Sequence, residues 1–265
     1  MAKSKPPSNR YLSLIKRIFV DRYQSGMTEV PFSRIDLTKA AKSLRIVLPK
    51  NLGDVIYSMR YRSALPDAIV KTQPAGKEWV IEGKGRAEYA FRLVAVSQIL
   101  PNPQMAVIKI PDATPEIVGA YALSDEQALL AKVRYNRLLD IFLEVAAYSL
   151  QNHLRTTVAN LGQVEIDEIY VAIDKRGRQY VVPVQAKGGN DRLSSVQTKQ
   201  DIACCNQKFP QLICRAVAAQ FISTDLIALF ELGGSGDEIK ILEERHYRLV
   251  PADQISRDEL RSYDR

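Results

Sequence analysis

The sequence predicts a mixed α/β protein in two parts. Apolar residues recur at helical spacing in several segments, and β-prone alternating stretches bounded by turn residues separate those segments. Basic residues are unevenly spread, because residues 1–90 hold 17 Lys and Arg against 8 Asp and Glu, a net charge of +9, whereas the remainder carries −2. We therefore expect a basic domain over residues 1–95, a linker over 96–123 and a second domain over 124–265.

The composition is that of an ordinary soluble protein. The 265 residues suffice to bury a core, and no apolar run approaches the roughly 20 residues that span a bilayer. The polar N-terminal segment has no apolar signal segment behind it. The three cysteines, Cys204, Cys205 and Cys214, lack metal-ligand spacing, so we expect a protein of the reducing cytoplasm with no membrane partner.

The first 95 residues predict three helices followed by a β-hairpin. Asp36 and Asn51 are plausible N-caps of the second and third helices. The expected elements are a helix over 10–25, a short strand or connector over 31–35, helices from Leu37 and after Asn51, a hairpin of 69–71 with 78–81, and a strand over 89–94.

This order of elements is typical of a winged helix-turn-helix domain, in which one helix enters the DNA major groove and the hairpin forms the wing. The net positive charge of this part fits a polyanionic partner. The residues expected to face DNA are Asn51, Ser58, Arg60, Arg62, Lys71 and Lys77. The alternative is a small α+β packing or oligomerisation module with solvated lysines.

The second part predicts a long helix followed by a group of strands. A Ser124-x-x-Gln127 capping box begins a helix that apolar spacing extends to about His153. The remaining expected elements are strands over 163–173 and 179–187, a helix over 193–208, strands over 212–221 and 226–232, and a C-terminal strand.

Polar residues interrupt the two strands of the central hairpin. Glu165 and Asp167 lie two apart and share a face of the first strand, and Gln185 and Lys187 share a face of the second. Glu168 points the other way and is expected to be solvated. Two acids, an amide and a lysine suit phosphodiester hydrolysis, because carboxylates hold Mg²⁺ and a lysine can orient water and stabilise negative charge on the phosphate.

The second part resembles the PD-(D/E)XK nucleases, whose core has the order αβββαβ, over about residues 125–230. The resemblance implies that Asp167 is the metal-binding Asp, and that Gln185 and Lys187 form the (D/E)-x-K element with Gln185 in place of a carboxylate. Glu144 falls where many members have another acid. Further polar site residues, Gln197, Gln200 and Asp201, are expected on the helix after the motif, with Gln197 and Gln200 binding DNA.

The resemblance implies a restriction-endonuclease-like enzyme that cleaves double-stranded DNA with Mg²⁺, or with Mn²⁺ in its place. The expected catalytic set is Asp167, Gln185, Lys187, Glu165 and Glu144, with Asp167, Gln185 and Glu165 as metal ligands. A homodimer is expected, since cutting both strands needs two active sites.

Three other interpretations stay open. A non-catalytic DNA-binding regulator on a decayed nuclease fold is consistent with the uncharged Gln185. A structure-specific repair nuclease shares the same site and differs in substrate. Asp167 and Lys187 also fit a purely structural ion pair across the hairpin.

Overall fold

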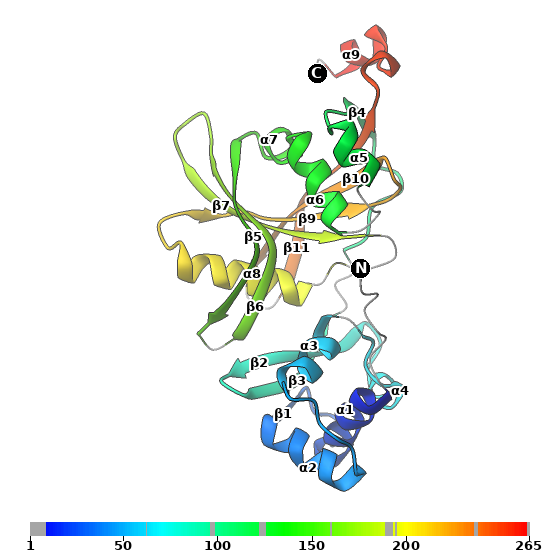
Figure 1. Ribbon diagram of the computed structural model, residues 1–265, viewed down its shortest axis with the longest axis vertical. Coiled ribbons are helices and arrows are strands. Elements are labelled where there is room, and N and C mark those ends of the chain that lie inside the picture. Colours follow the sequence, from blue (N-terminus) through cyan, green and yellow to red (C-terminus); the bar gives the residue numbers. More distant parts are fainter. Residues whose placement is uncertain are drawn as a thin grey trace. The chain divides into compact units, whose positions relative to one another are not determined.

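The computed structural model describes residues 9–61, 63–95, 99–121, 126–159, 161–188, 193, 195–235 and 238–263 (Figure 1). The chain divides into two compact units, one of residues 1–96 with 157–163 and one of residues 97–156 with 164–265. Both contain helices and a β-sheet, which confirms the predicted mixed α/β class. Within the described residues no helix has both the length and the apolar character needed to cross a membrane.

The first unit packs helices against a small antiparallel sheet with the strand order β1-β3-β2. Aromatic contacts join its layers, since the Phe19 ring lies 5.2 Å from that of Trp79 and 5.0 Å from that of Phe91. Its elements are α1 (Asn9–Arg22), β1 (Glu29–Ser33), α2 (Arg34–Leu44), α3 (Gly53–Tyr61), α4 (Asp67–Val70), β2 (Lys77–Gly85) and β3 (Glu88–Ala95).

Two local predictions for this unit were wrong. Helix α2 begins at Arg34 with Ser33 as its N-cap, and Asp36 is the third helical residue, whose carboxylate accepts a hydrogen bond from the Ser33 amide at 2.8 Å. The expected strand at 69–71 is the short helix α4. Pro66 precedes this helix, and Ile69 is buried in the apolar cluster of the first unit. The hairpin is formed by β2 and β3.

The second unit is built on an eight-stranded mixed sheet with the order β4-β11-β10-β9-β7-β6-β5, and β8 pairs with β7 (Figure 1). Strands β7 and β9 are parallel, whereas β6 and β7 are antiparallel. The elements are β4 (Val107–Pro111), α5 (Glu116–Tyr121), α6 (Glu126–Tyr135), α7 (Leu138–Leu143), β5 (Ala146–Val158), β6 (Gly162–Ile173), β7 (Gln179–Lys187), α8 (Ser195–Lys208), β8 (Ile213–Cys214), β9 (Ala216–Phe221), β10 (Leu226–Ser235), β11 (Glu238–Val250), a 3-10 turn (Ala252–Gln254) and α9 (Arg257–Ser262).

The predicted long helix to His153 is replaced by α6, α7 and the strand β5. Arg137 and Glu144 adopt left-handed backbone conformations, with φ of 51° and 53°, and these end each helical run. The Asn136 side chain also binds the Ala113 amide at 2.7 Å, so the break is held by a segment distant in sequence. In the segment expected as a linker, β4 pairs with β11 and forms one edge of the sheet.

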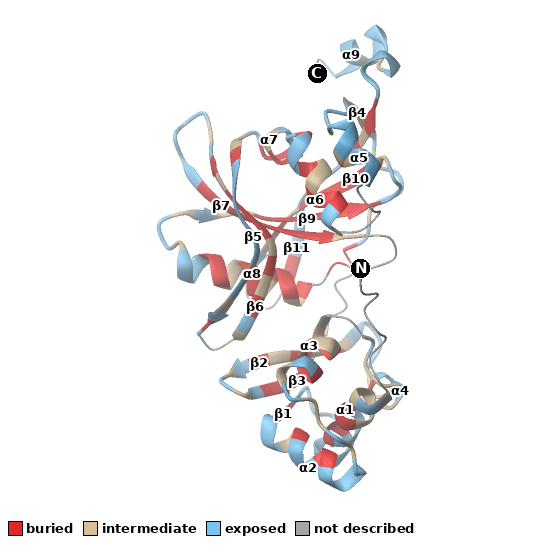
Figure 2. Cartoon of the chain, in the orientation of Figure 1, coloured by how far each residue is buried: buried red, intermediate tan, exposed pale blue. Residues whose placement is uncertain are grey.

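Helices cover both faces of the sheet, with different cores beneath them. Alternate residues of β7 and β9, including Val184 and Val217, pack with α6 and α7 in the larger apolar cluster. The opposite residues of β9, including Ala218, belong to a smaller cluster with Ile202 of α8. The inner side of α8 and strands β7 and β9 are buried (Figure 2).

The expectation that Glu168 is solvated was wrong, because its side chain is fully buried on the α6 face of β6. Its Oε1 atom accepts hydrogen bonds from Arg134 at 2.6 and 3.0 Å and from the Ser149 hydroxyl at 2.7 Å. A buried carboxylate held by a cation and a hydroxyl is a structural group whose loss leaves its partners uncompensated.

We predict that Glu168→Ala lowers the free energy of unfolding by about 3 kcal/mol, because breaking a buried ion pair is far more costly than losing an exposed one. The control is Glu29→Ala of β1, because Glu29 and its ion-pair partner Lys84 are 44% and 39% exposed. The control should cost less than about 1 kcal/mol. Urea denaturation measures both, and equal losses would contradict the structural role of Glu168.

Candidate active site

Asp167, Gln185 and Lys187 share the face of the sheet that α8 covers. The β7–β9 register pairs Gln185 with Ala218, a residue of the cluster beneath α8, and pairs Lys187 with Gln220. On the other side, the antiparallel β6–β7 ladder ends at the pair of Glu168 and Val184. Asp167 comes next, and its carboxylate accepts a hydrogen bond from the Ala186 amide at 3.0 Å. The register thus places Asp167 beside the end of β7, where Gln185 and Lys187 alternate with the apolar residues Val184 and Ala186 of the larger cluster.

Lys187 extends toward helix α6 at the end of β7. Its ammonium group lies 2.5 Å from a carboxylate oxygen of Glu126, a residue in the first turn of α6. The Lys187 side chain is only 17% exposed, so this ion pair fixes the position of a largely buried charge. Glu126 was not among the predicted site residues. It lies about 60 residues from Lys187 in the chain, and only its place beside the capping box of a helix marked it.

Gln185 is the most unusual polar group of this face. The residue is 2% exposed, and both the nitrogen and the oxygen of its amide lack a hydrogen-bond partner within the described part of the chain. Leaving a buried amide unsatisfied costs roughly 1–3 kcal/mol. Such a group indicates strain, a function or a ligand to be bound.

Over its first two turns, helix α8 buries mostly polar residues against the sheet. These are Ser195, Gln197, Thr198, Gln200 and Asp201. Their spacing of three and four residues places most of them on one side of the helix. Asp201 is 2% exposed, and its Oδ1 atom has no partner among the residues described.

The two aspartates have perturbed acidity. Burial raises the pKa of Asp201 well above its ordinary value, and the nearby negative charge of Asp167 raises it further. Burial also raises the pKa of Asp167, although the Ala186 amide and Lys187 oppose that shift. Each acid is thus held in a site that disfavours its charged form. A strongly perturbed acid in such surroundings is a candidate functional group.

The other two predicted acids lie in different surroundings. Glu165 is on the same face of β6 as Asp167, and its carboxylate binds the guanidinium of Arg155 at 3.0 Å. Glu144 is exposed at the end of α7, where it takes a left-handed conformation. It therefore does not lie on a helix facing the site, which was the reason for choosing it.

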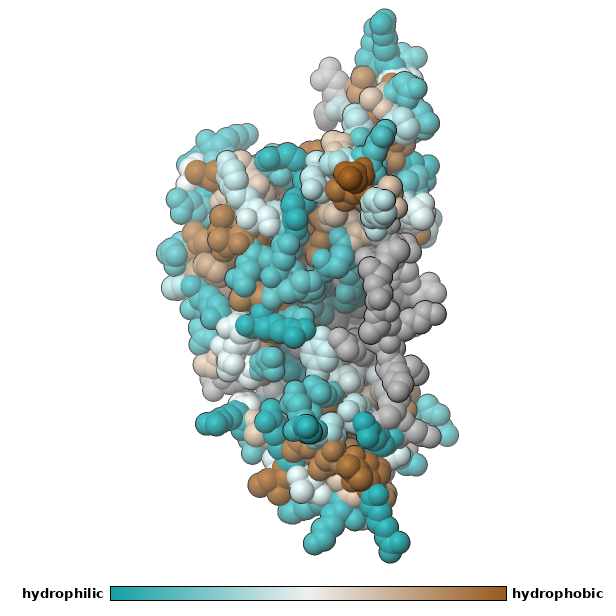
Figure 3. Space-filling view, viewed as in Figure 1, coloured by the Kyte–Doolittle hydropathy of each residue, from teal (hydrophilic) through white to brown (hydrophobic). Residues whose placement is uncertain are grey.

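The predicted DNA-facing residues of the first unit differ in their exposure to solvent, and two guanidinium nitrogens of Arg60 are buried. Lys71 and Lys77 are exposed, and Ser58 and Arg60 of α3 are half-buried. Asn51 is exposed, but its side chain already binds the Gly53 amide at 3.0 Å and Asp54 at 2.8 Å. Arg62 lies outside the described residues. Hydrophilic residues cover much of the visible surface of this unit (Figure 3).

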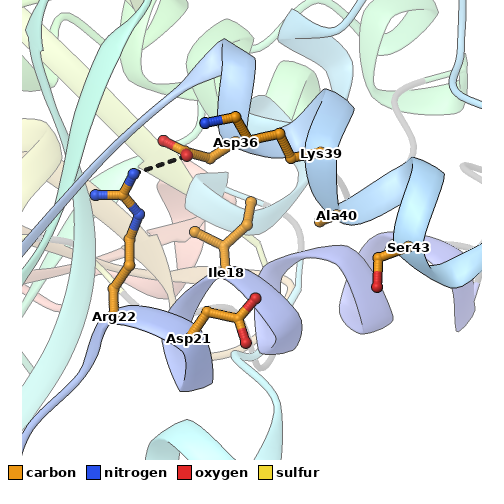
Figure 4. A pocket seen from close by; sticks show the side chains of 7 residues that line it. All are labelled: Ile18, Asp21, Arg22, Asp36, Lys39, Ala40 and Ser43. Carbon is orange, nitrogen blue, oxygen red and sulfur yellow. Dashed lines mark hydrogen bonds and ion pairs between the residues drawn. The ribbon is translucent and has the colours of Figure 1, made fainter.

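A separate pocket lies between α1 and α2 of the first unit (Figure 4). An ion pair of 2.7 Å between Arg22 and Asp36 crosses it, and Arg22 also donates to the Pro31 carbonyl at 3.0 Å. Two of its polar residues are thus joined to each other in a structural ion pair. The lining residues are Ile18, Asp21, Arg22, Asp36, Lys39, Ala40 and Ser43.

Among the described residues no three His, Cys, Asp or Glu side chains form a ready-made metal-binding group. The oxygen donors of the α8 face comprise carboxylates of Asp167 and Asp201 and the amide oxygen of Gln185. Comparison with family models, characterised proteins and solved structures gave no match.

We predict that Asp201→Asn raises the melting temperature in cation-free buffer, and that the gain grows with pH. An acid whose pKa is raised by folding binds its proton more tightly in the folded state, so its contribution to stability falls as pH rises from about 4 toward the folded pKa. Asparagine removes that loss. Differential scanning fluorimetry in EDTA should give a small gain at pH 5 and a larger one, about 3 °C or more, at pH 9. A difference independent of pH would contradict the buried ionisation of Asp201.

Proposed function

We propose that the protein is a divalent-cation-dependent endonuclease that hydrolyses phosphodiester bonds of double-stranded DNA, in the manner of a type II restriction enzyme. One observation carries the proposal. Asp167, Gln185 and Lys187 lie on one sheet face under a helix with a polar inner side, and the Gln185 amide is buried without a partner. The order α6, α7, β5, β6, β7, α8, β9 is compatible with an αβββαβ nuclease core.

The residues present fit a hard divalent cation such as Mg²⁺, or Mn²⁺ in its place. Such ions prefer oxygen ligands, and Mg²⁺ commonly takes one or two carboxylates and completes its shell with water and substrate phosphate. Asp167 supplies a carboxylate, and Gln185 supplies a desolvated amide oxygen that has no other partner among described residues. When bound, the cation neutralises charge on the phosphate and makes water a better nucleophile.

Lys187 has a separate role in the proposed site. Its ammonium group is largely buried, and the carboxylate of Glu126 restrains it at 2.5 Å. A restrained ammonium can orient the attacking water and stabilise negative charge that develops on the phosphate. We assign Glu126 as a positioning residue, because it acts through Lys187.

The first unit supports DNA recognition. Its order of helix, strand, three helices and hairpin, and its antiparallel β1-β3-β2 sheet, are compatible with a winged helix. In such a domain α3 would enter the major groove, and the β2–β3 hairpin would lie along the backbone. The net charge of +9 over residues 1–90 favours phosphate contacts. We further propose a homodimer, which would supply one site for each strand.

We predict that wild-type protein with Mg²⁺ or Mn²⁺ cuts plasmid and genomic DNA into discrete fragments, and that Asp167→Asn and Lys187→Ala abolish cutting. Removing a charge that acts on the reacting phosphate costs at least about a hundredfold in rate. The control is Arg178→Ala, which removes an exposed cation of a hairpin turn. Gel analysis of the products measures each rate.

Intact DNA in every cation and on varied substrates, methylated and branched ones included, would contradict the proposal. If the protein then still bound DNA, the non-catalytic regulator would be the better interpretation, and the uncharged Gln185 is the feature that favours it. Cutting of branched substrates alone would favour the structure-specific repair nuclease.

We predict that the double variant Lys71→Ala/Lys77→Ala weakens DNA binding and reduces the slope of log K against log salt by about 2, because each phosphate contact contributes close to one. The matched control is Lys39→Ala, which removes an exposed lysine of α2 at the pocket of Figure 4. Fluorescence anisotropy over a range of salt concentrations measures the slope. An equal reduction in both proteins would contradict a wing-centred interface.

A further inference from the structure

We propose that Asp201 is a ligand of the divalent cation, together with Asp167 and Gln185, and that it supplies the negative charge that Gln185 lacks. This inference rests on the proposed cation-dependent function. The sequence predicted polar site residues on α8 but no metal ligand, whereas the present proposal places a ligand on that helix.

The first support is position. Helix α8 packs on strands β7, β8 and β9, and Asp201 lies on the side of the helix that is buried against the sheet. Gln185 lies on the sheet face below, since its β9 neighbour Ala218 belongs to the cluster that includes Ile202 of α8. Asp201 of α8 and Gln185 of β7 thus both lie in the layer between that helix and the sheet.

The second support is the unmet bonding capacity of that layer. The Oδ1 atom of Asp201 and both amide atoms of Gln185 are buried, and they have no hydrogen-bond partners among the described residues. These residues are each 2% exposed. Two such groups from separate elements are costly together, and a bound cation would satisfy the oxygens of both.

The third support is charge. Lys187 shares the sheet face of Gln185, and its ammonium group forms an ion pair with Glu126 of α6. Asp167 and Asp201 place two carboxylates in the layer between the sheet and α8, and Asp201 is 2% exposed. A divalent cation bound by both would offset the repulsion between two buried negative charges.

The experiment measures Mn²⁺ binding to the full chain without DNA, by calorimetry and by the electron paramagnetic resonance signal of free Mn²⁺. Asp201→Asn and Asp167→Asn should each weaken binding by about tenfold or more. Asp258→Asn should bind Mn²⁺ as wild type does, because that carboxylate is 93% exposed on α9 and takes no part in the layer under α8. Circular dichroism and melting in EDTA establish that each variant is folded.

A charge-relocation variant makes the assignment specific. Gln185→Glu in the Asp201→Asn background moves one carboxylate from the helix to the strand, and it should restore Mn²⁺ affinity to within about threefold of wild type. A folded Asp201→Asn protein that binds Mn²⁺ as tightly as wild type would overturn the inference. If Asp167→Asn then still lost binding and DNA cutting, the proposed function would stand without it. If wild type bound no Mn²⁺ and cut no DNA, both would fail.

Discussion

Polar groups are buried between β7 and α8 without hydrogen-bond partners among the described residues, and this constrains the whole layer. Gln185 and Asp201 are both 2% exposed and both have unsatisfied atoms within the described residues. A fold selected for stability alone would fill such a layer with apolar side chains, as it does on the opposite face around Val184. The sheet and α8 therefore carry a cost that a ligand can offset.

The neighbouring strand β6 carries a buried charge that has a structural role. On the α6 face of β6, the Oε1 atom of Glu168 is bound by Arg134 and Ser149. One residue earlier, on the α8 face, Asp167 accepts a hydrogen bond from a backbone amide and lies near a second acid. Glu168 is thus held by a buried ion pair, although its Oε2 atom also lacks a partner among the described residues, whereas Asp167 is held by a backbone amide.

The sequence predicted the centre of the second unit well and its margins poorly. Strand β7 ran over the expected residues 179–187, because period-two alternation and a glycine turn define a hairpin locally. The helix to His153 failed because Arg137 and Glu144 take left-handed conformations that apolar periodicity does not reveal. Glu126 escaped notice because its partner Lys187 is distant in the chain, and nothing in the local pattern joins them.

The most direct test of the central claim is the anomalous scattering of Mn²⁺ in crystals of the full chain grown with that ion. We expect an anomalous peak within about 2.5 Å of oxygen atoms of Asp167, Gln185 and Asp201. Such a peak would explain why Gln185 and Asp201 are buried with atoms that have no other partner among the described residues. Crystals that bind Mn²⁺ elsewhere, or whose Gln185 and Asp201 bind each other or ordered water with no ion between them, would contradict a cation site at this position.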